Sequence, residues 1–107
     1  MSSRSKPGLE AGVPVIGLLL IELHFPEARS LKSKRMVVKS IKDRLRRCFN
    51  IAIAETGYLE LWQRAELAAV SVSGSRQLVE AQLEAVNRDL EACFSGELLG
   101  TSMELIE

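Results

Sequence analysis

The sequence has few of the residues on which covalent cross-links and metal centres depend. Its 107 residues include two cysteines, Cys48 and Cys93, and one histidine, His24. Two cysteines are too few for a disulfide framework, and adding one histidine does not complete a zinc-binding set. We therefore expect no metal and no cofactor. We expect both thiols to be reduced and buried, each near the carboxyl end of a different helix.

Long apolar stretches are also missing. The longest covers residues 13–21, about nine positions, and contains Pro14 and Gly17, whereas a membrane-spanning helix needs about 20 apolar residues. The first residues are small and polar, without the apolar stretch of a signal peptide. The sequence predicts a flexible tail over residues 1–14, one domain over residues 15–107, no membrane partner and a cytoplasmic location.

The net charge is zero, but the two signs are separated along the chain. Residues 29–47 hold nine Lys or Arg side chains against one acid, Asp43, which gives about +8. Residues 48–107 hold three basic side chains against ten acidic ones, which gives about −7. This separation exceeds what solubility requires and indicates a surface for a polyanion or an acidic partner.

Hydrophobic periodicity predicts four strands and two helices. Residues 15–24 are rich in branched apolar side chains, as in a central strand, and residues 27–49 have a helical period with Ser30 as the N-cap. Strand-like stretches follow at residues 51–56 and 62–73, a helix capped by Ser75 at 75–94, and a strand at 97–107. This order predicts an α+β, ferredoxin-like βαββαβ sandwich. Its antiparallel sheet has the strand order 4-1-3-2, with both helices on one face.

The first predicted helix separates apolar from basic side chains. At 100° per residue, its apolar stripe includes Leu31, Val38, Ile41 and Leu45. Lys34 falls inside this stripe and must extend to the surface or find a partner. Five cations lie within about 80° of one another on the other side, and we call them the basic ridge: Lys32, Arg35, Lys39, Lys42 and Arg46.

The basic ridge fits three kinds of surface. Evenly spaced cations can follow a sugar–phosphate backbone, and with Arg29 and Arg47 the ridge gives seven predicted phosphate contacts. The same cations also fit a solvated helix face. A third possibility is that the cations contact another copy of the protein through its second helix. That helix carries the acidic residues Glu80, Glu84, Asp89 and Glu91.

The first strand carries no aromatic residue on either face. Base stacking on the sheet, as in RNA-recognition motifs, is therefore not expected, and any RNA contact should involve the helix. One face would hold Ile16, Leu18, Leu20, Glu22 and His24, and the other Val15, Gly17, Leu19, Ile21 and Leu23. Both sets are apolar near the middle, so the face without helices favours a homodimer unless the tail or a loop covers it.

No set of residues predicts catalysis or a small-molecule substrate. Arg64 and Glu66 should lie on one side of a strand near Glu22, as a cross-strand ion pair. His24, near Glu22, Glu55 or Glu60, has no nucleophile or phosphate-binding loop beside it. Trp62 is expected in the core or as an anchor of the hairpin. We expect no enzymatic activity.

Two stretches resemble a known family. LHFPEARSLKSKR at residues 23–35 and ETGYLELWQRAELAAVSVS at residues 55–73 resemble sequences of the YlxP-like family of small bacterial proteins, which carry a domain of unknown function. The resemblance covers about residues 15–106. It implies a ferredoxin-like fold and no established catalytic residues. Because such proteins are often encoded beside translation and ribosome-maturation factors, it also implies a role with ribosomes or RNA.

This sequence departs from the family at Ser33, where a glutamate would complete a capping box with Ser30, so we expect a looser helix start. The sequence as a whole predicts a non-enzymatic module that binds structured RNA or ribosomal particles. The alternative is a homodimeric module that uses the open sheet face and an acidic protein partner. The predicted nucleic-acid contacts are Arg29, Lys32, Arg35, Lys39, Lys42, Arg46 and Arg47.

Overall fold

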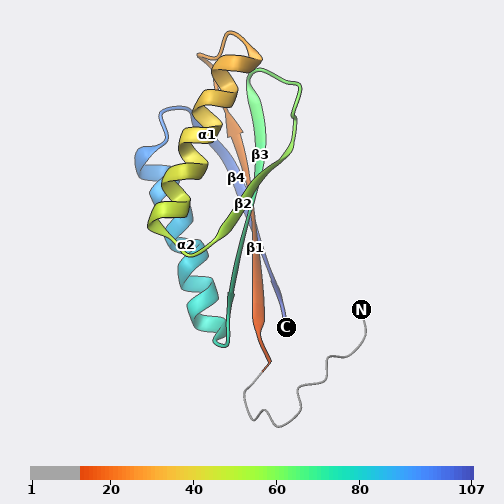
Figure 1. Cartoon of the computed structure of the whole chain (residues 1–107), viewed down its shortest axis with the longest axis vertical. Coiled ribbons are helices and arrows are strands. Elements are labelled where there is room, and N and C mark those ends of the chain that lie inside the picture. The colour runs from red at the N-terminus through yellow and green to blue at the C-terminus, as the bar shows by residue number, and fades with distance from the viewer. Residues whose placement is uncertain (1–12) are drawn as a thin grey trace.

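The structure, a computed structural model, describes residues 13–107. Most of the predicted tail, residues 1–12, lies outside the described residues. Within the described part, the elements follow the predicted order (Figure 1). They are β1 (Val15–His24), α1 (Leu31–Cys48), β2 (Ala52–Gly57), β3 (Arg64–Ser73), α2 (Arg76–Cys93) and β4 (Glu97–Ile106).

The strands of residues 13–107 form one antiparallel sheet in the order β2-β3-β1-β4, which confirms the predicted order read from the opposite edge. β1 lies in the middle and pairs with β3 and β4, so that Ile16 faces Val72 on one side and Ile106 on the other. Both helices cover the same face of the sheet (Figure 1). The ferredoxin-like α+β fold is therefore confirmed.

The core lies between this face of the sheet and the helices. Alternate residues of β1 point into it, and Leu19, Ile21 and Leu23 are buried. α2 packs closely against β1 at Gly17, where a Cβ atom would lie 2.3 Å from Cγ1 of Val79. A Cβ atom here would force Val79 or α2 to shift, because Cβ contacts under 3.0 Å are essentially never found.

The start of α1 is better capped than the sequence suggested. Ser30 Oγ accepts a hydrogen bond of 3.0 Å from the Ser33 amide, and Ser33 Oγ accepts one of 3.3 Å from the Ser30 amide. Ser33 Oγ also lies 3.2 Å from the amide nitrogen of Arg29, which donates to it. A serine therefore completes the capping box in place of a glutamate, and the expectation of a looser helix start is wrong.

The expected burial of both cysteines is also wrong. Cys48 and Cys93 are exposed, because the phenylalanine after each of them packs against the core instead. In the first turn of α2, Val79 is buried, whereas Leu78 before it is 63% exposed. Of the two places expected for Trp62, the core is excluded, because Trp62 lies in the loop between β2 and β3 and is 53% exposed.

No helix within residues 13–107 is both long enough and apolar enough to cross a membrane.

Candidate nucleic-acid interface

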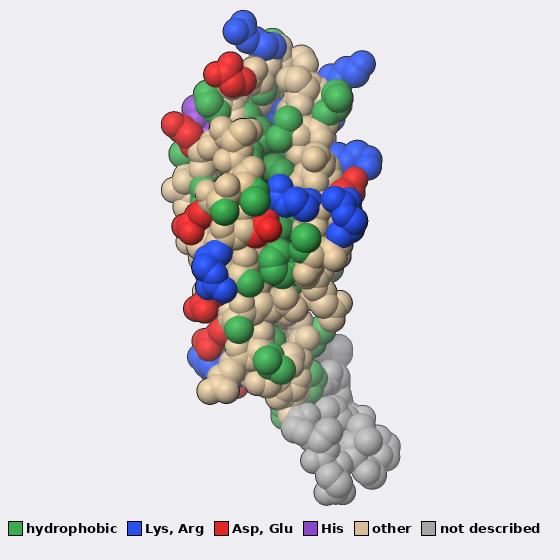
Figure 2. All heavy atoms as spheres, turned by 90° about the vertical axis from the view of Figure 1, so that its left-hand side faces the viewer, with side chains coloured by type: hydrophobic (Ala, Val, Ile, Leu, Met, Phe, Trp, Pro, Cys, Tyr) green, Lys and Arg blue, Asp and Glu red, His purple; other side chains and the backbone are tan. Residues whose placement is uncertain are grey.

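Helix α1 carries six of the seven predicted contact residues, and Arg29 lies in the loop just before it. Six of the seven side chains are exposed, and Lys42 is half-buried. Figure 2 shows Lys and Arg side chains gathered toward one side of the helical layer, with most of the Asp and Glu side chains on the other side. The folded chain thus preserves the separation of charge seen in the sequence.

The basic ridge lies on the side of α1 that faces the edge strand β2. Arg46 shows this directly, because its Nη2 donates a hydrogen bond of 2.9 Å to the carbonyl oxygen of Ile53 at the start of β2. α1 and β2 run in opposite directions, so the amino end of α1 lies near the loop that follows β2 (Figure 1). The ridge therefore follows one edge of the molecule for the length of the helix.

Part of the ridge is neutralised within the helix. Lys39 donates to Asp43 at 2.8 Å, and Arg46 Nη1 lies 3.5 Å from the other oxygen of the same carboxylate. The hydrogen bond from Lys39, with the nearby arginines, holds the pKa of Asp43 below its usual value. Arg44, which is not on the ridge, pairs with Asp89 of α2, so some attraction between the helices is internal.

The other predicted contacts have no carboxylate partner in the part of the chain that the structure describes. Seven cations were predicted to contact phosphate, and two of them, Lys39 and Arg46, form ion pairs. The remaining five form none among residues 13–107. They are Arg29, Lys32, Arg35, Lys42 and Arg47.

Lys34 is fully buried and connects α1 to the β2–β3 loop. Its Nζ donates hydrogen bonds to the carbonyl oxygens of Tyr58, at 2.9 Å, and Arg64, at 3.0 Å. Oε2 of Glu55 lies 3.0 Å from the same nitrogen, close enough for an ion pair but without the angle of a hydrogen bond. The sequence left open whether Lys34 extends to the surface or finds a partner; the structure shows the second, with two backbone carbonyl groups that nothing in the sequence identified.

A polar cluster occupies one end of the sheet face opposite the helices. Arg64 pairs with Glu22, which confirms the expected cross-strand ion pair. The hydrogen bond from Arg64, followed by that from Tyr58, lowers the pKa of Glu22, and the carboxylate in turn raises the pKa of the Tyr58 hydroxyl. His24 contacts Glu97 at 2.6 Å rather than any of the three expected glutamates. Each of these charged groups is thus paired with another group of the cluster.

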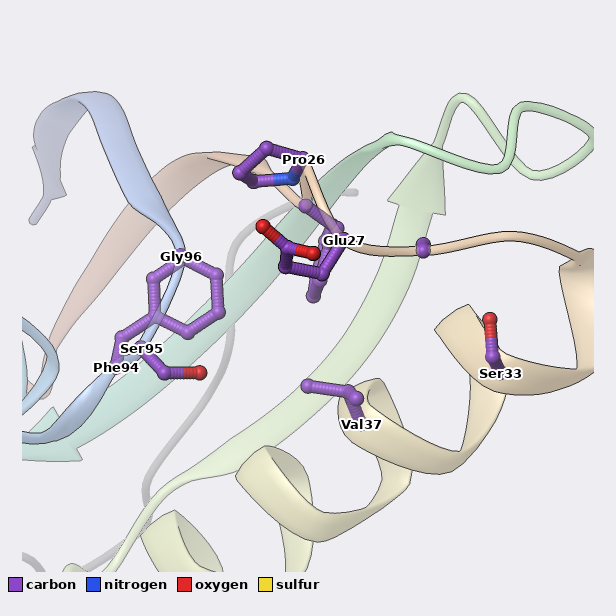
Figure 3. A pocket seen from close by; sticks show the side chains of 9 residues that line it. Pro26, Glu27, Ser33, Val37, Phe94, Ser95 and Gly96 are labelled. Atoms are coloured by element: carbon purple, nitrogen blue, oxygen red, sulfur yellow. The ribbon is translucent and has the colours of Figure 1, made fainter.

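Among residues 13–107, no three His, Cys, Asp or Glu side chains come together in a way that could hold a metal ion. A hollow of about 140 Å³ lies between the loop after β1, the first turns of α1 and the end of α2 (Figure 3). Phe25 and Phe94 meet edge to face beside it, with ring centres 5.3 Å apart. Glu27 is the one charged side chain in its lining, so the hollow does not extend the basic surface of α1.

The sheet and helices define a small ferredoxin-like α+β protein with a basic first helix along one edge. The family model described as "Protein of unknown function (DUF503)" matches residues 16–103, and the chain belongs to this family. It is similar to the "Uncharacterized protein YlxP" of Bacillus subtilis (strain 168), with 40% identity over 72 residues, 67% of this chain and 78% of that protein. The predicted resemblance to the YlxP-like family is confirmed.

Proposed function

We propose that this protein is a non-enzymatic module that binds structured RNA or a ribosomal particle through α1, with low sequence specificity and without a cofactor. The observation that carries the proposal is the set of five cations on residues 29–47 that form no ion pair among the described residues. Such cations can each replace a counterion on a phosphate group, and the released counterions supply the binding free energy. The proposal implies the cytoplasm, where such RNA is located.

The structure allows a quantitative expectation for the salt dependence. If five cations each contact one phosphate, the slope of log affinity against log salt is about −3.5 to −4.5, from −0.7 to −0.9 per contact. A fourfold rise from about 50 to about 200 mM salt would then weaken binding about 100- to 500-fold. Co-sedimentation with ribosomal subunits and bulk RNA at both salt concentrations measures this loss.

The matched test uses charge reversals on the two helices. Arg35→Glu with Lys42→Glu removes two unpaired cations of the ridge and should weaken binding at least 10-fold and reduce the salt slope by about 2. Arg88→Glu is the control, because Arg88 is an exposed cation of α2 without an ion pair in residues 13–107. RNA binding that the double variant leaves unchanged, or that Arg88→Glu weakens equally, would refute the role of the ridge.

A second candidate function is supported by the sheet face opposite the helices. The cross-strand neighbours Ile16 and Val72, and Leu18 and Val70, make this face apolar at the end away from the polar cluster, and Val72 is 58% exposed. A face of this kind fits a homodimer, which could then use the ridge for an acidic protein partner.

Analytical ultracentrifugation of the wild type and of Leu18→Asp tests the homodimer. Leu18 lies on the face that the helices leave open and is half-buried, so the variant should fold. We expect a wild-type dimer and a folded monomeric variant. A wild-type monomer at all concentrations would exclude this candidate.

A further inference from the structure

The loop between β2 and β3 exposes an unusual number of large apolar side chains. Tyr58, Leu59, Leu61 and Trp62 are each between 42% and 53% exposed, and they lie within five consecutive residues. Single exposed apolar residues are normal on a protein surface, whereas a concentration of them marks a contact site. The sequence predicted Trp62 in the core or as an anchor of the hairpin, and its exposure excludes the core.

Hydrogen bonds tie the loop to two neighbouring segments, helix α1 and the loop after β1. Lys34 of α1 donates to the carbonyl oxygens at both ends of the loop, those of Tyr58 and Arg64. The side-chain amide of Gln63 donates to the carbonyl oxygens of Pro26 and Ala28, at 3.2 and 3.3 Å. Tyr58 has a φ angle of 58°, in the left-handed region that residues other than glycine rarely adopt. A ligand of this loop would therefore meet a backbone that is already held by hydrogen bonds.

The loop carries two aromatic rings, those of Tyr58 and Trp62, and the Tyr58 ring already contacts Arg64. The guanidinium carbon of Arg64 lies 4.5 Å from the centre of the Tyr58 ring, and Nη2 of Arg64 is 3.3 Å from its hydroxyl oxygen. Trp62 has no aromatic or cation partner in the described part of the chain. It lines a shallow hollow of about 310 Å³ with Leu61, Gln63 and Arg64. Its indole is thus the exposed ring that remains for a ligand.

The loop also lies at the amino end of the basic helix. Lys34 joins it to the first turn of α1, and Gln63 joins it to Ala28, the residue before Arg29. Figure 1 shows the β2–β3 loop beside the start of α1, at the top of the molecule. Arg29 and Lys32, two of the unpaired cations, belong to this end of the helix. The loop that exposes the Trp62 indole and two of the unpaired cations therefore lie at the same end of the molecule.

We propose that Trp62 stacks on an unpaired base of the RNA whose phosphates α1 contacts, so that the ligand has a single-stranded or loop segment next to a structured one. This inference rests on the proposed function and deepens it. Every base has an aromatic face, so stacking on Trp62 adds affinity without sequence preference. The neighbouring cations favour RNA over an apolar protein segment, which would gain nothing from Arg29 and Lys32.

Trp62 is the single tryptophan of the chain, so its fluorescence reports on this loop alone. The probe is a short single-stranded oligoribonucleotide, compared with a strand of the same length that has the same phosphates but no bases. We expect the strand with bases to quench the emission of Trp62, and the abasic strand to bind through the ridge without quenching.

Variants give a second measurement through the anisotropy of labelled strands. Trp62→Ala should weaken binding of the strand with bases about 10-fold, as loss of one base–aromatic stack does, and leave the abasic strand unaffected. Trp62→Phe should restore most of the lost affinity because it restores an aromatic ring. Leu78→Ala is the control, since Leu78 is an exposed apolar residue of α2, outside both the loop and the basic ridge, and the variant should bind both strands as the wild type does.

Three results would overturn the inference. If the strand with bases binds while Trp62 emission and the Trp62→Ala affinity stay unchanged, the stacking role is wrong and the proposed function stands. If the abasic strand quenches the Trp62 emission as strongly as the strand with bases, the quenching reports a change in the loop and not stacking on a base. If the emission shifts with protein concentration alone, the loop is a contact between copies. Absence of binding to either strand would instead contradict the proposed function itself.

Discussion

Replacing Lys34 with methionine tests whether this buried cation holds α1 against the sheet. Methionine keeps most of the apolar stem but removes the amine, which leaves two backbone carbonyl groups without a donor and the Glu55 carboxylate without a cation. The Glu55 side chain is only 14% exposed, so water compensates it poorly. Removing one partner of a buried ion pair costs about 3–5 kcal/mol of unfolding free energy.

That loss is a large share of the stability of a domain of this size, which is about 5–15 kcal/mol. At about 4–8 °C per kcal/mol, the melting temperature should fall by at least about 12 °C. Urea denaturation followed by circular dichroism gives the free energy directly. Replacing Glu55 with methionine as well should recover part of the loss, because an apolar pair leaves no buried charge behind.

The control is Lys39→Met on the same helix. Lys39 also pairs with an acid, but 75% of its side chain is exposed, and an exposed pair contributes about 0–1 kcal/mol. If Lys34→Met lost less than about 1 kcal/mol, or no more than Lys39→Met, the argument from burial would be refuted.

Three further predictions concern packing, pH and thiol chemistry. Gly17→Ala should lower the free energy of unfolding by about 1–3 kcal/mol, because the new methyl group overpacks α2 against β1. Gly100→Ala is the control: no atom lies within 4 Å of its new Cβ, so the free energy of unfolding should change by less than about 0.5 kcal/mol. Urea denaturation compares the two. Because the folded pKa of Glu22 is lowered, its ion pair stabilises above the ordinary value of 4.5 and is lost as pH falls through the lowered value. The difference in melting temperature between wild type and Glu22→Gln should therefore shrink on acidification below 4.5, and a constant difference would contradict this. Cys48 and Cys93 should both react with a thiol reagent in the native protein at rates near those of the unfolded chain, and protection of either would show that it is buried.

The sequence was most informative where the spacing of apolar residues matches the period of a strand or a helix. The period of two in β1 divided its residues correctly into two faces, but both sets are apolar, so it could not tell which face the helices cover. Packing decided this, since Gly17 lies on the covered face and gives α2 room to approach. The period of α1 likewise located the basic ridge and marked Lys34 as misplaced.

What the sequence could not provide depends on contacts between distant segments. The acceptors of Lys34 are carbonyl groups, which every residue carries, so only the fold selects those of Tyr58 and Arg64. Residue type misled at Trp62 and at the two cysteines, because these types are usually buried. The exposure of Trp62 follows from its place in a loop fixed by its neighbours, which no local pattern of residues records.

The central position of β1 affects how the chain can fold during its synthesis. β1 is made first among the strands, yet its partners are β3 and β4, and Ile16 pairs with Ile106 near the other end of the chain. Until β4 has been released, β1 has an unpaired edge, with backbone groups open to pairing with any other extended chain. Translation that stops after α2 should therefore yield fragments that aggregate. Folding of the whole chain should be limited by the closure of this long-range pairing rather than by helix formation.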